Sequence, residues 1–128
     1  PYFQNGVEQV IIKLAAWNIA PAICYESLQP THAKSACKLG ANVYLASVAK
    51  PANGLEKAVE HYPFIAKQYA MPVLMSNAVG FCDNFLSVGK SAVWTKKGEL
   101  VGQLDDKTEG ILIFDTATEE IVLKHLNN

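Results

Sequence analysis

The stretch IAPAICYES, residues 19–27, joins an apolar run to a group of polar residues. The apolar run is typical of a short strand buried in a sheet. It ends at Cys24, and the segment YES follows directly. We therefore predict that a buried strand ends here and presents the thiol of Cys24 at its tip.

Strand-like and helix-like segments alternate on either side of this stretch. One helix is expected from Pro30, because proline suits a first helical turn, to Gly40, because glycine often ends a helix. A second helix over residues 55–70 is expected to be broken or kinked near Pro63. Gly98 predicts the bend of a late hairpin. The predicted strands are residues 10–14, 18–24, 42–47, 72–80, 91–95, 100–104 and 110–116, with a loop through 81–85 and a polar, peripheral tail after the last strand.

This order of elements alternates early and becomes antiparallel late, which predicts an α/β layered domain with a mixed β-sheet. The 128 residues most simply form a single domain over residues 1–128. Half of the residues are hydrophobic and only 18% are charged, so we expect a partner to cover some apolar surface. The start at Pro1, without a methionine, suggests a processed chain or a fragment.

Charge and cysteine content exclude several classes of function. Eleven basic side chains nearly balance twelve acidic ones without clustering, which argues against binding to nucleic acid or to an anionic membrane. No apolar stretch approaches the length of a membrane span, and no leader segment opens the chain. Three cysteines, Cys24, Cys37 and Cys82, form no CxxC motif, so neither a disulfide framework nor a metal site is expected. We predict a reduced, cytoplasmic setting and no cofactor.

Cys24 has two interpretations from its position alone. A free cysteine often packs as a small hydrophobe, and we expect this of Cys37 on its helix. A nucleophilic Cys24 needs a nearby base or cation, because an ordinary thiol is only a few per cent thiolate at neutral pH. No turn pattern directs His32 or His61 at Cys24, although a Cys/His enzyme stays open as an alternative. Glu26 is near in sequence but can equally be structural, bonding to neighbouring backbone.

Several motifs follow Cys24 in a fixed order. The segment ICYE, residues 23–26, is followed by Pro30 and then by the pair Gly40–Ala41 before a strand. The strand VLMSN ends in Asn77, and the segment GKS at 89–91 leads into the predicted hairpin. This ordered set resembles the carbon–nitrogen hydrolase (nitrilase/amidase) superfamily over nearly the whole chain. One departure is IAKQY at 65–69, where many members have R-A-x-E-N.

The resemblance implies a fold and a set of site residues. The fold is one half of a four-layer αββα sandwich (nitrilase-like), with helices on one face of the sheet, and this chain is the C-terminal half. The family's triad is Glu–Lys–Cys, with Cys24 as the nucleophile and the backbone N–H of Tyr25 beside the oxyanion. The upstream Glu and Lys are missing here, since Glu8 and Lys13 lie too near the cysteine. The pocket residues it implies are Glu26, Ser47, Val48, Ala49, Asn77 and Phe81.

The implied function is hydrolysis of non-peptide carbon–nitrogen bonds in a small amide, nitrile or carbamoyl substrate through an acyl-enzyme. The resemblance also implies a homodimer for the full-length protein and an inactive 128-residue chain on its own. The missing Glu and Lys leave an alternative function, a catalytically silent nitrilase-like scaffold or interaction module.

Overall fold

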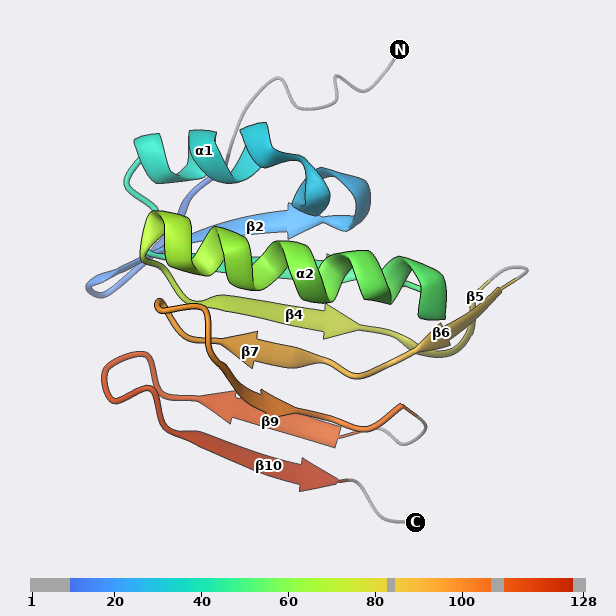
Figure 1. The fold of residues 1–128 in the computed structure, drawn as a ribbon. Coiled ribbons are helices and arrows are strands. Elements are labelled where there is room, and N and C mark those ends of the chain that lie inside the picture. Colours follow the sequence, from blue (N-terminus) through green and yellow to red (C-terminus); the bar gives the residue numbers. More distant parts are fainter. Residues whose placement is uncertain (1–9, 83–84, 107–109, 126–128) are drawn as a thin grey trace.

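The computed structural model describes residues 10–82, 85–106 and 110–125. Its centre is a six-stranded mixed sheet with two helices on one face (Figure 1). The strands lie in the order β1-β2-β3-β4-β7-β8. Their bounds are Ile12–Leu14 for β1, Trp17–Ile23 for β2, Val43–Val48 for β3, Val73–Asn77 for β4, Ala92–Trp94 for β7 and Leu100–Gln103 for β8.

The remaining elements are one 3-10 helix, two α-helices and two separate hairpins. A short 3-10 helix, η1, directly follows β2, and the helices α1 and α2 come next along the chain. Among the described residues, no helix is long and apolar enough to cross a membrane. The bounds are Cys24–Leu28 for η1, Pro30–Lys38 for α1, Ala52–Tyr69 for α2, Val79–Cys82 for β5, Phe85–Val88 for β6, Gly110–Phe114 for β9 and Ile121–His125 for β10.

Strands β2, β3 and β4 run parallel, and the other neighbours in the sheet pair antiparallel. Parallel neighbours need a long crossover connection, which α1 supplies between β2 and β3 and α2 supplies between β3 and β4. The late antiparallel strands need only short turns, such as the one at Gly98, whose φ is +82°. The mixed sheet predicted from the order of elements is therefore confirmed.

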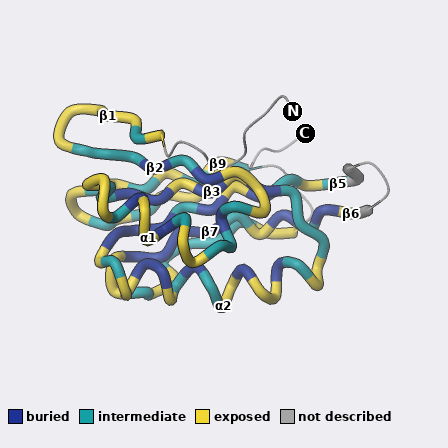
Figure 2. The backbone as a smooth tube through the Cα atoms, turned by 90° about the horizontal axis from the view of Figure 1, so that it is seen from above, coloured by how far each residue is buried: buried dark blue, intermediate teal, exposed yellow. Residues whose placement is uncertain are grey.

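The hydrophobic core lies between the sheet and the two helices (Figure 2). Alternate residues of each parallel strand face the helices, as the period of two in a strand requires. Ala20, Ala22 and Ala46 are fully buried there, and their small side chains allow the helices to approach the sheet closely. Tyr44 and Tyr62 fill the remaining volume from β3 and α2.

The opposite face of the sheet is only partly covered. Hairpin β9–β10 lies over it, where Leu112 lines a cavity together with Leu45 and Leu74. Nearer to Cys24, Ile23 is 57% exposed and Leu45 is 38% exposed. Large apolar side chains on this face therefore lack a cover within the described part of the chain.

Three predicted elements differ from the structure. Within the expected loop over 81–85, residues 81–82 belong to β5 and residue 85 belongs to β6, and these strands pair as a hairpin in which Val79 lies opposite Val88. The expected polar tail contains β10, which pairs with β9 along its length. The second helix is not broken near Pro63, because α2 continues through it to Tyr69. Buried Tyr62 and Ile65 anchor α2 on both sides of the proline, which outweighs the hydrogen bond that a proline removes.

Candidate active site

The carboxyl ends of the three parallel strands meet at one edge of the sheet. Ile23 at the end of β2 pairs with Ser47 of β3, and Val48 of β3 pairs with Asn77 at the end of β4. Cys24, which follows β2, and Asn77 therefore lie at the same edge of the sheet, with the end of β3 between them. In open α/β sheets this edge is where ligands bind.

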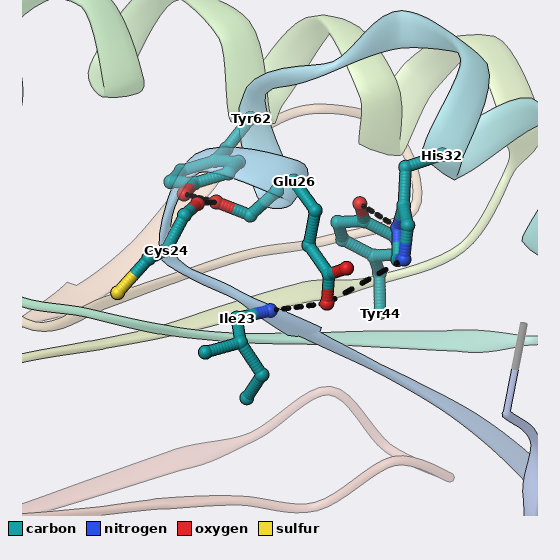
Figure 3. Close-up of polar contacts among 7 residues, drawn as sticks. Ile23, Cys24, Glu26, His32, Tyr44 and Tyr62 are labelled. Atoms are coloured by element: carbon teal, nitrogen blue, oxygen red, sulfur yellow. Dashed lines mark hydrogen bonds and ion pairs between the residues drawn. The ribbon is translucent and has the colours of Figure 1, made fainter. Parts of the chain in front are cut away.

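Cys24 is the first residue of η1, at the sharp turn that follows β2. Its φ is +50°, in the left-handed region that residues other than glycine seldom adopt. Such a conformation costs roughly 1–3 kcal/mol and persists only where neighbouring structure holds it. The turn leaves the Cys24 side chain exposed, and Figure 3 shows its sulfur pointing away from the polar contacts of η1. The backbone thus turns sharply from a strand into a helix without flanking glycines, and we call this segment, residues 23–28, the elbow.

Hydrogen bonds through Ser27 hold the elbow on the side that faces α2. The hydroxyl of Ser27 donates to the Cys24 carbonyl at 2.6 Å. Since that uses the one hydroxyl hydrogen of Ser27, the Tyr62 hydroxyl donates to Ser27 Oγ, also at 2.6 Å. Burial raises the pKa of Tyr62, and a negative charge on Cys24 raises it further. Helix α2 therefore fixes the turn that carries Cys24.

Glu26 links the elbow to the end of β2 and to α1. Its Oε2 accepts the Ile23 N–H at 2.8 Å and lies 3.7 Å from Nε2 of His32 (Figure 3). The Nδ1 of His32 lies 2.8 Å from the Tyr44 hydroxyl. Burial lowers the pKa of His32, and the charge of Glu26 partly opposes this. The carboxylate of Glu26 is thus engaged by backbone and imidazole.

Lys50 lies two residues beyond the end of β3. Asn77 fixes its backbone, because Oδ1 of Asn77 accepts the Lys50 N–H at 2.7 Å and Nδ2 donates to the Lys50 carbonyl at 3.3 Å. The same Nδ2 donates to the Gly89 carbonyl at 2.8 Å. Burial lowers the pKa of Lys50, and a negative charge on Cys24 raises it.

The sequence profile described as carbon–nitrogen hydrolase matches residues 1–123. The chain belongs to the carbon–nitrogen hydrolase family. The recognition of this family from the motifs around Cys24 is confirmed. No curated protein matches the sequence at a significant level.

Solved structures with the same fold include two kinds of enzyme. The glutamine-dependent NAD+ synthetase from Acinetobacter baumannii matches with a TM-score of 0.80 and 22% identity, over 99% of this chain and 24% of that one. A mutant of the amidase from Nesterenkonia sp. AN1 matches at 0.72 and 16% identity, over 92% of this chain and 41% of that one. That structure shows the acetamide moiety of fluoroacetamide added covalently at the active-site cysteine. This carbon–nitrogen hydrolase chain spans less than half of either protein, and at these identities the likeness shows the fold alone.

The pocket residues that the resemblance implied lie at different places along the strand ends. Tyr25 follows Cys24 directly in η1, and its side chain is 75% exposed. In β3 the side chain of Ser47 is exposed, whereas Val48 is buried among the core residues. Ala49 is half-buried beside Lys50. The last implied residue, Phe81, lies in β5, and its side chain is outside the described part of the structure.

Other residues named from the sequence lie apart from Cys24 or outside the structure. Lys13 is exposed in β1, and Glu8 lies outside the described residues. His61 of α2 bonds to the backbone of Ser27, which raises its pKa, but burial lowers that pKa more. Within the described residues, neither His61 nor His32 contacts Cys24.

Sequence reasoning did not identify Lys50 or Tyr62. A signal existed for Lys50, because it directly follows the implied pocket segment 47–49. No comparable signal existed for Tyr62, since its bond to Ser27 joins residues 35 positions apart.

Proposed function

We propose that the protein hydrolyses non-peptide carbon–nitrogen bonds, with Cys24 as the nucleophile. The observation that carries this proposal is the exposed Cys24 on a strained elbow, at the ligand-binding edge of the sheet, in a chain of this family. A cysteine kept only for packing needs neither exposure nor a left-handed backbone.

The proposed reaction proceeds through a thioester. A general base takes the proton of the Cys24 thiol and later returns it as the general acid. The sulfur bonds to the amide carbon, and the π electron pair of the carbonyl moves to oxygen, where the Tyr25 backbone N–H donates to it. The carbon–nitrogen bond then breaks, and the nitrogen leaves as ammonia or an amine after taking a proton from the general acid. Water adds to the thioester, and its breakdown gives the carboxylic acid and the free thiol.

The general base and the catalytic lysine of this scheme come from outside this chain. Among the described residues no carboxylate contacts Cys24, since Glu26 is engaged by Ile23 and His32. The chain also spans only 41% of the Nesterenkonia amidase. Both facts support the view that this chain is the C-terminal half of the hydrolase.

The uncovered sheet face supports the same division. Exposed Ile23 and Leu45 would be buried if the other half, with a second sheet, packed there as a four-layer sandwich. Family resemblance further suggests that the complete protein forms a homodimer.

An amide is the favoured substrate class over a nitrile. The support is the amidase among proteins of similar fold, in which a cysteine carries a covalent acetamide moiety. A thiolate can attack either kind of carbon, so this preference depends on the comparison and not on the thiol itself.

The decisive experiment compares two cysteine variants of the full-length protein on a panel of small amides and nitriles. Cys24→Ala should lower kcat/KM by at least about a thousandfold, because it removes the nucleophile. The matched control, Cys37→Ala, should retain activity. Undiminished hydrolysis by Cys24→Ala would disprove the proposal, and a wild-type protein without turnover would favour the silent scaffold. The 128-residue chain alone should show no turnover.

A further inference from the structure

Two hydrogen bonds connect the middle of α2 to the peptide group that follows the nucleophile. The Tyr62 hydroxyl donates to Ser27 Oγ at 2.6 Å, and the Ser27 hydroxyl donates to the Cys24 carbonyl at 2.6 Å. Ser27 and Tyr62 are both fully buried, so water does not compete for these bonds. The reaction above uses the Cys24 sulfur and the Tyr25 N–H, but it gives no role to the two buried hydroxyls.

The side chain of Tyr62 has a fixed position in the core. Its ring lies 5.7 Å from the ring of Trp94 in β7, at an interplanar angle of 50°. Trp94 is itself buried. Burial raises the pKa of Tyr62, so its hydroxyl keeps the proton that it donates. The first donor of the pair of bonds is therefore held by the core and stays protonated at neutral pH.

The Cys24 carbonyl and the Tyr25 N–H belong to one peptide group. No peptide bond in the described part of the chain is cis, and in a planar trans peptide the C=O and the N–H point in opposite directions. Since the carbonyl is directed at Ser27, the N–H is directed away from Ser27. The Cys24 sulfur also points away from Tyr62 (Figure 3). The nucleophile and the oxyanion donor are thus both directed away from the buried hydroxyls.

We propose that Ser27 and Tyr62 are positioning residues that orient the Tyr25 N–H toward the oxyanion of the substrate. This inference rests on the proposed function, in which Cys24 attacks a carbonyl carbon. Donation to the Cys24 carbonyl fixes the plane of the peptide, so the N–H keeps one direction while charge develops on the substrate oxygen. Consecutive hydrogen bonds also polarise one another, which makes the Tyr25 N–H a stronger donor.

Two reagents that modify the same sulfur test this inference without turnover. With p-nitrophenyl acetate the sulfur bonds to the ester carbon through an oxyanion, p-nitrophenolate leaves, and the thiol proton goes to solvent. With iodoacetamide the sulfur displaces iodide from a saturated carbon and loses its proton to solvent, and no oxyanion forms. In the full-length protein, the acylation rate is the p-nitrophenolate release after subtraction of that by Cys24→Ala. Mass spectrometry of the Cys24 peptide gives the alkylation rate.

The ratio of the acylation rate to the alkylation rate should fall about tenfold in Ser27→Ala, less than the loss of an oxyanion donor, because the N–H stays but loses its orientation. Tyr62→Phe keeps the ring and its packing, so the ratio should fall only about two- to threefold. This second variant carries the test if Ser27→Ala does not fold. The matched control is Tyr69→Phe on the same helix, which should keep the wild-type ratio.

The double variant Ser27→Ala/Tyr62→Phe separates orientation from stability. Ser27→Ala alone leaves the buried Tyr62 hydroxyl without its acceptor, so removing that hydroxyl as well should recover part of the lost free energy of unfolding. The ratio should nevertheless stay as low as in Ser27→Ala, because Tyr62 acts through Ser27.

Three results would overturn the inference: a ratio that recovers together with stability in the double variant, an unchanged ratio in either single variant, or an equal fall in Tyr69→Phe. The proposed function fails separately, if Cys24→Ala retains hydrolysis. In that case the acylation-to-alkylation ratio would still decide whether Ser27 and Tyr62 orient the N–H.

Discussion

Cys24 and Cys37 are the same residue type on consecutive elements, η1 and α1, yet their surroundings differ. Cys24 is exposed, with φ at +50°, and buried polar groups hold its turn from behind. Cys37 is half-buried on α1, where Ala33 and Ala36 face the core. The comparison shows that backbone conformation and support, and not residue type, set one thiol apart.

The largest expected difference between the two sites is in thiol reactivity. In the full-length protein, iodoacetamide should label Cys24 at least about tenfold faster than Cys37, because the Cys24 thiol is exposed and the Cys37 thiol is half-buried. Peptide mass spectrometry over a pH series measures both rates in one sample. Equal, slow labelling of the two thiols would remove the distinction and favour a silent scaffold.

A smaller effect, on the free energy of unfolding, is expected when a serine near each cysteine is replaced by alanine. Ser27→Ala deletes the hydroxyl that joins the Cys24 carbonyl to Tyr62, so the free energy of unfolding should fall by about 1–3 kcal/mol. Urea unfolding measures this change. The matched control is Ser35→Ala on α1, where the side chain is exposed and the expected change is within about 0.5 kcal/mol.

The same pair of variants sharpens the comparison of the thiols. Ser27→Ala should alter the labelling rate of Cys24 and leave that of Cys37 unchanged under native conditions. Equal changes at both cysteines would mean that the substitution loosens the whole domain instead of the elbow.

The smallest expected effect is a pH dependence of the folding stability, caused by His32 and His61 near the elbow. Burial lowers the pKa of both His32 and His61 below 6.5 in the folded chain. The unfolded chain therefore binds protons first as the pH falls, so stability should be complete above about pH 6.5 and decrease below it. Thermal unfolding between about pH 8 and pH 5.5 measures this, and His61→Gln should flatten the curve. An identical curve in His61→Gln would exclude this histidine as a source.

Sequence patterns predicted much of the framework. Pro30 and Gly40 bounded α1 correctly, since their backbone preferences are local. The strand that precedes Cys24 and the strand that ends at Asn77 were also found, because a buried strand leaves a continuous apolar run. The polar end of the first strand gave Cys24 as a candidate residue, the family resemblance gave Asn77, and the structure brings the two strand ends to one edge.

Elements that depend on distant partners were not predictable. β10 looked like a polar tail, because its strand character comes from pairing with β9. Pro63 suggested a break in α2, but packing on both sides keeps the helix continuous. Local propensity is a weak guide wherever tertiary contacts contribute more free energy than the backbone preference.

The sequence by itself determined the family, the alternation of strands and helices, and the cysteine that follows β2. It could do so because these features depend on periodicity and on motifs of adjacent residues. Only the tertiary structure decided that Cys24 is exposed on a left-handed turn, that Tyr62 supports this turn, and that Asn77 fixes the backbone of Lys50. Those facts depend on packing between elements that are far apart in the chain, and no local pattern encodes such contacts.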